Sequence, residues 1–442
     1  MPDSLGFSRR ADRLAHTFPS GGVPGGGVHL RHRSPDPPGR RLDDARDRKP
    51  WGRLSKGGGA KDDAATDASA AVDESVFSQA HGTFIAVEYE AIPGEGEDAE
   101  PLRLLGPSDV VVLGVFDGLG GAGGARYEIE GMERKGAYIA SRLARGITLQ
   151  EAERRLVAPV TDLASALNMG TQFAAGLAER LQLEFHRVAS SLAGEPSSLR
   201  SSMVRVLPTT AALVIVWPSR DGRGVGPESR LGCAVWAGDS RIYVLSPSRG
   251  LVQVSSDDAR VKSDALASLE SDPPIDNCIS ASRDFRLNTF AWELNEPSIV
   301  FAATDGCFGY LPTPAHFEIA LLDAMSGAAT SEDWQRGLAA SISSVARDDA
   351  SLVAATLGFE DFNALRAAFE PRRAYVQKEF VEPYALRQDV LLTADRELAA
   401  LKQRRDELAE ARSQCAKQLW QRYRPGYEQL VAAQLRDQEP AP

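Results

Sequence analysis

The sequence predicts an α+β domain in which helices cover antiparallel sheets, placed between a disordered leader and a helical tail. Three observations predict this organisation. Residues 1–76 are rich in Gly, Pro and Arg and lack apolar periodicity, so they cannot offset the entropy cost of ordering. Between residues 77 and 360, apolar runs of strand length alternate with two pairs of helix-like stretches. From residue 361 to residue 442 the chain is charged, with apolar residues at alternating spacings of three and four.

The composition is that of a globular protein with an acidic body. The chain has 442 residues, of which 43% are apolar and 25% charged. Residues 1–60 hold 12 Lys/Arg and 6 Asp/Glu, and the remainder holds 38 and 55, which leaves a net charge of −17 there. Nucleic-acid binding needs clustered cations, so we expect no nucleic-acid partner. An acidic body is compatible with divalent metal.

Cysteine usage and hydropathy favour a cytoplasmic protein. The four cysteines lie far apart without a C-x-x-C pair, which argues against a disulfide framework or a zinc ribbon. The longest apolar stretches, such as 211–217, fall short of the roughly 20 residues that a membrane helix needs. We therefore expect a reducing compartment and no membrane association.

Taken in order, the segments predict a leader, a core domain and a tail. The leader either contacts an acidic partner through its basic residues or is merely solvated, and the second interpretation is simpler. In the core, residues 231–237 and 241–245 are joined by a Gly-Asp turn and predict a hairpin. The other expected strands are 84–92, 109–118, 211–217, 298–303 and 350–359, and the expected helices are 136–156, 164–192, 314–325 and 331–347.

The tail carries an apolar stripe that predicts a helical hairpin or a short coiled coil, divided by prolines at positions 371, 383 and 425. Arg405 and Arg412 interrupt the stripe, and buried charge disfavours a long parallel dimer. Two interpretations remain open. The stripe binds a partner helix or a second copy, or it folds back on residues 362–369. Its members are Leu391, Ala394, Leu398, Leu401, Leu408, Cys415 and Leu419.

Acidic turns recur at strand ends and indicate a cation site. Asp117 and Asp305 each end a buried-type strand, so both side chains are expected at the rim of a sheet. Asp98 and Asp239 lie in further acidic turns, and Asp348 begins the last strand. Converging carboxylates repel one another unless a cation lies among them. Oxygen ligands without His or Cys favour Mg²⁺ or Mn²⁺ over zinc.

Five motifs, in order, resemble the metal-dependent type 2C serine/threonine protein phosphatases. They are VFDGLGG at 115–121, TTAALVIV at 209–216, WAGDSRIYVL at 236–245, FAATDGCFGYL at 301–311 and RDDASLVAATL at 347–357. The resemblance covers residues 78 to 360. It implies a four-layer β-sandwich of two antiparallel sheets flanked by helices, with a two-metal centre at one rim.

The resemblance also implies roles for individual residues. Asp117 would bridge two Mn²⁺ or Mg²⁺ ions and the Gly118 carbonyl would bind one of them, with Asp305 and Asp348 on the other. A metal-activated water would then attack phosphorus in line. Glu97 and Asp98 match the early Glu-Asp pair of the family, and Asp239 matches the ligand of an additional, weaker metal.

The sequence departs from the family pattern at several positions. Residues 91–97 contain no arginine to hold phosphate, and Arg126 is one residue that would compensate. Leu119 stands where the family often has His or Met, and Gly309 where it often has a further acidic ligand. Pro208 replaces the usual Gly before the Thr-Thr pair.

The sequence therefore predicts a phosphatase that removes phosphate from serine or threonine of a protein substrate phosphorylated by a serine/threonine kinase. One alternative is a catalytically weak domain that binds phosphoproteins or acts as a scaffold through its tail. Another is a structural protein assembled through residues 385–420.

Overall fold

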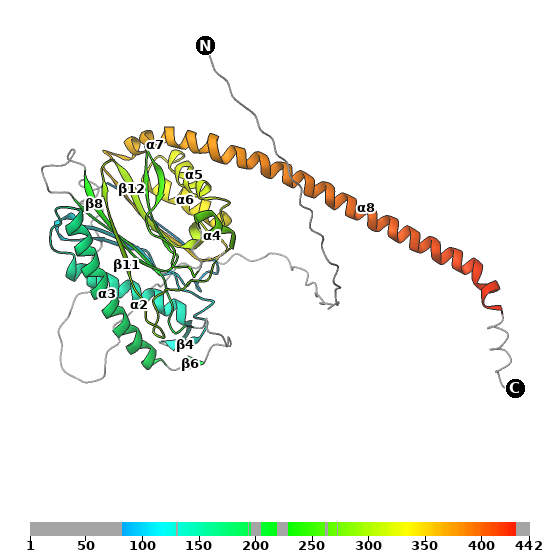
Figure 1. Cartoon of the computed structure of the whole chain (residues 1–442), viewed down its shortest axis with the longest axis horizontal. Helices are drawn as coiled ribbons and strands as arrows, with labels where there is room; N and C mark the ends of the chain where they lie inside the picture. The colour runs from blue at the N-terminus through cyan, green and yellow to red at the C-terminus, as the bar shows by residue number, and fades with distance from the viewer. Residues whose placement is uncertain are drawn as a thin grey trace, which may run out of the picture. The chain divides into compact units, whose positions relative to one another are not determined.

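The structure is a computed structural model that describes residues 82–129, 131–192, 194–195, 205–218, 229–260, 264–271 and 273–429. The predicted leader, residues 1–76, lies outside the described residues. All the described residues belong to one unit of the chain (Figure 1).

The first antiparallel sheet is built around two of the predicted strands, which pair with each other in a six-residue register from Ser298↔Leu357 to Ala303↔Leu352. Its strand order is β1 (Phe84–Tyr89), β13 (Ala350–Leu357), β12 (Ser298–Ala303), β9 (Arg241–Ser246) and β10 (Gly250–Gln253).

The second antiparallel sheet contains the most apolar segment of the sequence, β7, in which seven of eight residues are buried. Its strand order is β11 (Asn288–Leu294), β8 (Arg230–Ala237), β7 (Ala211–Pro218), β3 (Val111–Val115) and β2 (Leu102–Leu105). β2, β10 and β11 were not predicted, because their sequences are short or place polar residues among the apolar ones.

The predicted hairpin over residues 231–245 is wrong. β8 pairs with β7 and β11 in the second sheet, whereas β9 pairs with β10 and β12 in the first. The Gly238–Asp239–Ser240 turn therefore crosses from one sheet to the other. Gly238 has φ +103°, a conformation that favours glycine, and a Cβ there would meet the Thr210 side chain at 2.6 Å. Turn chemistry does not distinguish a hairpin from such a crossing.

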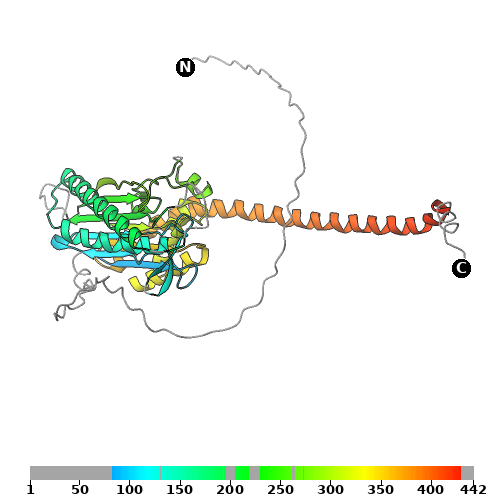
Figure 2. The same cartoon turned by 90° about the horizontal axis from the view of Figure 1, so that it is seen from below.

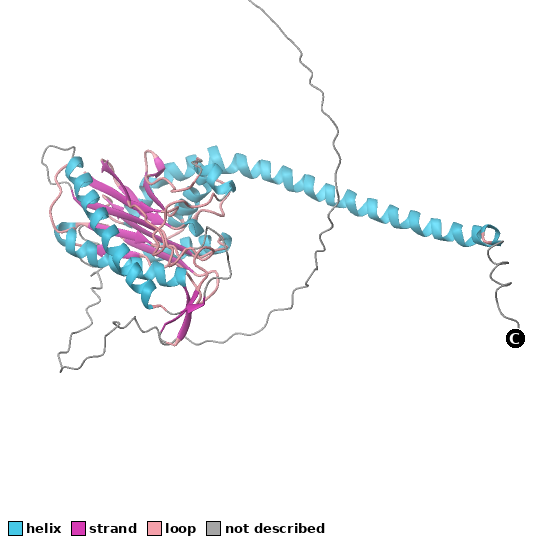
Figure 3. Ribbon diagram, turned by 60° about the horizontal axis from the view of Figure 1, so that its bottom comes forward, coloured by secondary structure: helices cyan, strands magenta, loops and turns pink. Residues whose placement is uncertain are grey.

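Helices cover both outer faces, so the predicted four-layer sandwich is confirmed (Figure 3). One apolar core lies between the two sheets, and one lies between each sheet and its helices. The helices on the second sheet are α2 (Gly136–Arg155) and α3 (Leu163–Ser191), and those on the first are α5 (Pro314–Ser326) and α6 (Ser331–Val345). All four were predicted to within a few residues.

A small third sheet follows the glycine-rich loop after β3. Its strand order is β5 (Met132–Lys135), β4 (Arg126–Ile129) and β6 (Gly194–Glu195). Strands β4 and β5 pair with each other as an antiparallel hairpin. The sequences RYEI and MERK are too polar and too short to predict as strands. The hairpin places several cations close to the loop that contains Glu97.

The C-terminal helices differ from the prediction. α7 (Phe362–Val376) buries Leu365 and Phe369 in the core of the first sheet, so the packed domain extends past the predicted boundary at residue 360. Pro383 lies in the first turn of α8 (Glu382–Tyr427), where no N–H is needed, directly after the π-helical turn η3 (Gln377–Val381). Within the described residues, which end at 429, the tail is therefore one long helix after η3, without the predicted hairpin (Figure 2).

α8 does not pack its apolar stripe on residues 362–369. It contains no buried residue, and Leu391 and Leu401 of the stripe are 55% and 68% exposed. In the part of the chain that the structure describes, neither α8 nor any other helix is long and apolar enough to cross a membrane.

Candidate functional site

Five connections of the sandwich meet at one rim and carry the predicted carboxylates. They are the loop between β1 and β2 with Glu97 and Asp98, the residues after β3 with Asp117 and Gly118, the β8–β9 crossing with Asp239, the turn after β12 with Asp305, and the residues before β13 with Asp348. The two sheets contribute together: the β1–β2 and β8–β9 connections run between the sheets, the residues after β3 belong to the second sheet, and the turn after β12 and the residues before β13 belong to the first.

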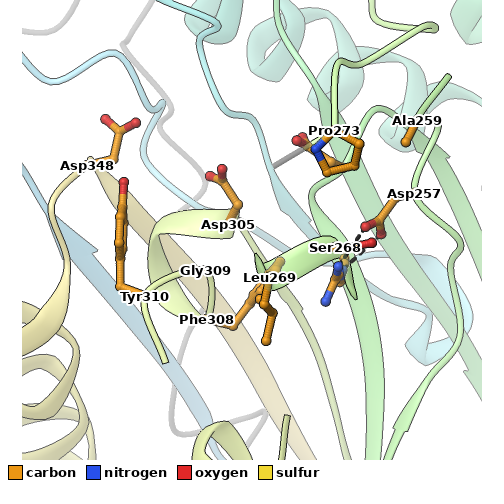
Figure 4. Close-up of a pocket in the computed structure, with 12 residues that line it drawn as sticks. Asp257, Ala259, Ser268, Leu269, Pro273, Asp305, Phe308, Gly309, Tyr310 and Asp348 are labelled. Atoms are coloured by element: carbon orange, nitrogen blue, oxygen red, sulfur yellow. Dashed lines mark hydrogen bonds and ion pairs between the residues drawn. The ribbon is translucent and has the colours of Figure 1, made fainter. Parts of the chain in front are cut away.

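A pocket of about 300 Å³ opens at this rim. Asp239, Asp305 and Asp348 line it, and in Figure 4 the carboxylates of Asp305 and Asp348 point to the same side. Phe308, Tyr310, Leu269 of the short helix α4 (Ala265–Ser271) and Pro273 also line it. The pocket thus combines an acidic end with apolar and aromatic walls.

Asp98 and Asp117 lie beside this pocket and interact with each other and with Asp305. Burial raises the pKa of Asp98 to about 7; contacts with Asp117 and Ser351 oppose this, and the charge of Asp305 adds to it. Burial also raises the pKa of Asp117 well above its usual value, and the charges of Asp98, Asp305 and Asp239 raise it further. Four of the predicted carboxylates are therefore close enough to disfavour one another's ionisation.

The Thr-Thr strand start holds Asp117 through its backbone. Thr209 Oγ1 donates to the Asp117 carbonyl at 2.7 Å, and the Thr210 amide donates to the same carbonyl at 2.8 Å. The Asp117 amide donates to Thr210 Oγ1 at 3.3 Å, and that hydroxyl is 2.7 Å from the hydroxyl of Ser240, next to Asp239. The threonine pair thus connects two of the acidic turns.

Thr304 performs a similar role for Asp98. Its hydroxyl donates to Asp98 Oδ2 at 3.0 Å and accepts from the Ser351 amide at 2.9 Å. Thr304 directly precedes Asp305, so one residue connects the loop after β1 with the turn after β12.

Asp349 is a site residue that the sequence analysis missed in favour of its neighbour Asp348. Its carboxylate accepts from the amides of Ala91 and Glu97, at 2.9 and 2.5 Å, and so caps the loop that presents Asp98. The adjacent turn needs glycine at Gly306, where a Cβ would lie 1.9 Å from the Asp349 carbonyl oxygen. The Asp-Asp dipeptide was visible in the sequence, but only the structure distinguishes the pocket residue from the capping residue.

Glu97 is not brought into the pocket. Its side chain pairs with Lys135 of β5 at 2.6 Å. Burial raises the pKa of Glu97, and Lys135 opposes that rise. Arg142 of α2 donates to the carbonyls of Gly96 and Glu97, each at 3.3 Å. The backbone just before Asp98 is therefore held by cations from the third sheet and from α2.

Replacing Arg142 by methionine should lower the free energy of unfolding by about 1–3 kcal/mol, because the Gly96 carbonyl would lose its arginine donor and the Glu97 carbonyl would keep only the Ser141 hydroxyl. Arg142→Lys should recover only part of the loss, since one ammonium cannot reproduce a planar fork. Urea denaturation measures both. Arg336→Met removes a largely exposed arginine paired with Asp333 and serves as the control, with a change below about 0.5 kcal/mol. Equal losses for Arg142→Met and Arg336→Met would contradict the assignment.

The arginines near the site have defined partners. Arg241 lines the pocket, but it is bonded through two nitrogens to Asp257, at 2.9 and 2.6 Å, and lies 4.5 Å from the centre of the Phe308 ring. Arg126, the candidate replacement for the absent phosphate-binding arginine, pairs with Glu133 at 3.2 Å. It lines a second pocket, of about 260 Å³, beside β4 and β5. Arg126 is thus not in the pocket of Asp305.

The carboxylate oxygens at the rim are of the ligand type that a hard cation prefers. No group of three or more Asp, Glu, His or Cys side chains among the described residues is gathered closely enough to form a ready metal site. Oδ1 of Asp98, however, is inaccessible to solvent and has no hydrogen-bond partner, and Asp117 and Asp305 are its charged neighbours. A solvent-inaccessible carboxylate oxygen among other carboxylates is a suitable ligand for Mg²⁺ or Mn²⁺.

Comparisons with known proteins give structural likeness only. No protein-family model matches the sequence, and no curated protein matches it. Among solved structures, a bacterial serine phosphatase is 16% identical, with a TM-score of 0.44 over 62% of this chain and 97% of that chain. The serine/threonine phosphatase Stp1 from Staphylococcus aureus is 15% identical, with a TM-score of 0.43 over 62% and 94%. The Mycobacterium tuberculosis serine/threonine phosphatase PstP/Ppp is 15% identical, with a TM-score of 0.41 over 62% and 97%.

Proposed function

We propose that the chain is a metal-dependent phosphatase that hydrolyses phosphoserine or phosphothreonine in a protein substrate, using two Mn²⁺ or Mg²⁺ ions. The observation that carries the proposal is the convergence of Asp98, Asp117, Asp239 and Asp305, from both sheets, at one rim. These carboxylates oppose one another's ionisation, and bound cations would remove that opposition.

Some residues of the rim would bind the cations, and others form hydrogen bonds to the backbone that positions those ligands. Asp117, the Gly118 carbonyl, Asp98, Asp305 and Asp348 are the ligands that we assign to the two ions, with Asp239 on an accessory one. Bound cations would activate a water for attack on phosphorus and offset charge on the phosphoryl oxygens.

The pocket walls are suited to a peptide side chain next to the phosphate. Tyr310 is 41% exposed and can contact a substrate, while Phe308 is buried. Arg241 is held by Asp257 and by the Phe308 ring, so its guanidinium is already paired within the protein. We therefore assign phosphate binding to the cations rather than to an arginine.

A second candidate function is phosphoprotein binding without turnover. The observation that favours it is the loop 91–97, which contains no arginine, together with the pairing of Glu97 with Lys135. A kinase-phosphorylated partner would then bind at the same rim and remain phosphorylated.

Phosphate release from a phosphothreonine peptide, with and without Mn²⁺, tests the proposal. We expect turnover with Mn²⁺, loss of turnover in excess chelator, and recovery when Mn²⁺ is returned. An Asp305→Asn variant purified in parallel should be inactive, which excludes a contaminating phosphatase. Turnover that survives complete metal removal would contradict the mechanism. Peptide binding without phosphate release, at any metal concentration, would favour the second function.

A further inference from the structure

Helix α8 presents a seam of seven uncharged residues and three arginines that nothing in the described part of the chain covers. Its ten positions alternate in steps of three and four from residue 391 to residue 422, and at about 1.5 Å per residue they span about 48 Å. The five leucines of the seam are all at least half exposed. The seam consists of Leu391, Ala394, Leu398, Leu401, Arg405, Leu408, Arg412, Cys415, Leu419 and Arg422.

The charges of α8 are distributed unevenly along its length. Residues 382–401 contain four acidic and two basic side chains, whereas residues 402–427 contain seven basic and three acidic ones. The first half is therefore net −2 and the second half net +4. Two such helices attract when they lie antiparallel, because each acidic half then faces a basic half. In a parallel pair the two basic halves would face each other.

The arginines of the seam favour the same orientation. In a parallel pair in register, Arg405, Arg412 and Arg422 would each face the same arginine of the partner, at a cost in repulsion and desolvation. In an antiparallel pair centred between residues 406 and 407, each arginine faces a leucine. The facing pairs are Arg405 with Leu408, Arg412 with Leu401 and Arg422 with Leu391. The aliphatic part of arginine packs on leucine while its guanidinium reaches solvent.

We propose that α8 is a self-association element that pairs with α8 of a second copy of this chain in an antiparallel coiled coil. This register also places Cys415 opposite Leu398 of the other copy. The proposal is independent of the proposed phosphatase function, since none of the residues involved lies at the rim.

Light scattering of the full chain at micromolar concentration tests the association. We expect a mass of twice the chain's 47.5 kDa. Leu401→Lys should give the monomer mass, because it places a second cation opposite Arg412 of the other copy. Leu392→Lys, on the same helix but off the seam and 42% exposed, is the matched control and should remain dimeric. A monomeric native chain, or a Leu401→Lys variant that stays dimeric, would overturn the proposal.

Disulfide crosslinking tests the orientation, because the other cysteines, Cys233, Cys278 and Cys307, are buried. Under mild oxidation the native chain should give no crosslinked dimer, and Leu398→Cys should give one through Cys415 of the other copy. A strong Cys415–Cys415 crosslink in the native chain would show a parallel pair and overturn the proposal. Leu391→Cys should not crosslink, and a crosslink there in place of Leu398→Cys would overturn the register.

Discussion

Asp117→Asn should reduce phosphatase turnover by about 100- to 1,000-fold, equivalent to about 3–4 kcal/mol, whereas Asp239→Asn should lose much less. Asp117 interacts with Asp98, Asp305 and Asp239 together, so we assign it to both essential cations, and Asp239 to an accessory one at most. Initial rates at saturating Mn²⁺ measure the difference.

The two asparagine variants control for each other, because both keep the volume of the side chain. The backbone of Asp117 is held by Thr209 and Thr210, so the substitution leaves its position intact. Melting temperatures of both variants should be measured beside the rates. Equal losses of turnover in the two variants would contradict the assigned roles.

Asp98→Asn should stabilise the metal-free protein at about pH 8 by a few kcal/mol while it weakens Mn²⁺ binding. Burial raises the pKa of Asp98 to about 7 in the folded chain, above its ordinary value of 3.8. Between these two values the folded state binds more protons than the unfolded state does. Stability of the native chain in chelator should therefore fall as the pH rises through this window and stay low above pH 7.

Urea denaturation in chelator, from about pH 5 to about pH 8, measures the effect. The native chain should lose stability across this range, and Asp98→Asn should lose less. Excess Mn²⁺ at pH 8 should restore the native chain but not the variant. Asp389→Asn, on the exposed surface of α8, is the control and should keep the native pH dependence. A variant with the full native pH dependence would show that Asp98 is not the group that titrates.

The sequence predicted those strands and helices whose pattern of apolar residues is compatible with only one kind of secondary structure. Strands β3 and β12 are apolar apart from Gly114 and Ser298, so Asp117 and Asp305, which follow them, could be located at a rim. The β4–β5 hairpin could not be predicted, because its strands are short and mostly polar. The β8–β9 connection was predicted as a hairpin and is instead a crossing between the sheets, because Gly238 and Asp239 are equally suited to both kinds of turn.

The site was predictable as a set of carboxylates and not as a set of contacts. Acidic turns at strand ends, together with the family resemblance, identified Asp98, Asp117, Asp239, Asp305 and Asp348 as candidates. It could not show which carboxylates point into a pocket, which cap a backbone, and which pair with a lysine. Those distinctions depend on where loops that are distant in sequence meet, and the turning of Glu97 toward Lys135 is the clearest case.

The crossing turn at Gly238–Asp239–Ser240 has a mechanical consequence. It connects a strand of one sheet directly to a strand of the other, and the Thr210–Ser240 hydroxyl contact fastens it to the β7 start. Sliding of one sheet over the other would therefore displace Asp305, which follows β12 of the first sheet, relative to Asp117 and Asp239. A ligand that bridged the carboxylates of the two sheets would resist that shear, so occupancy of the rim and the rigidity of the whole sandwich would rise together.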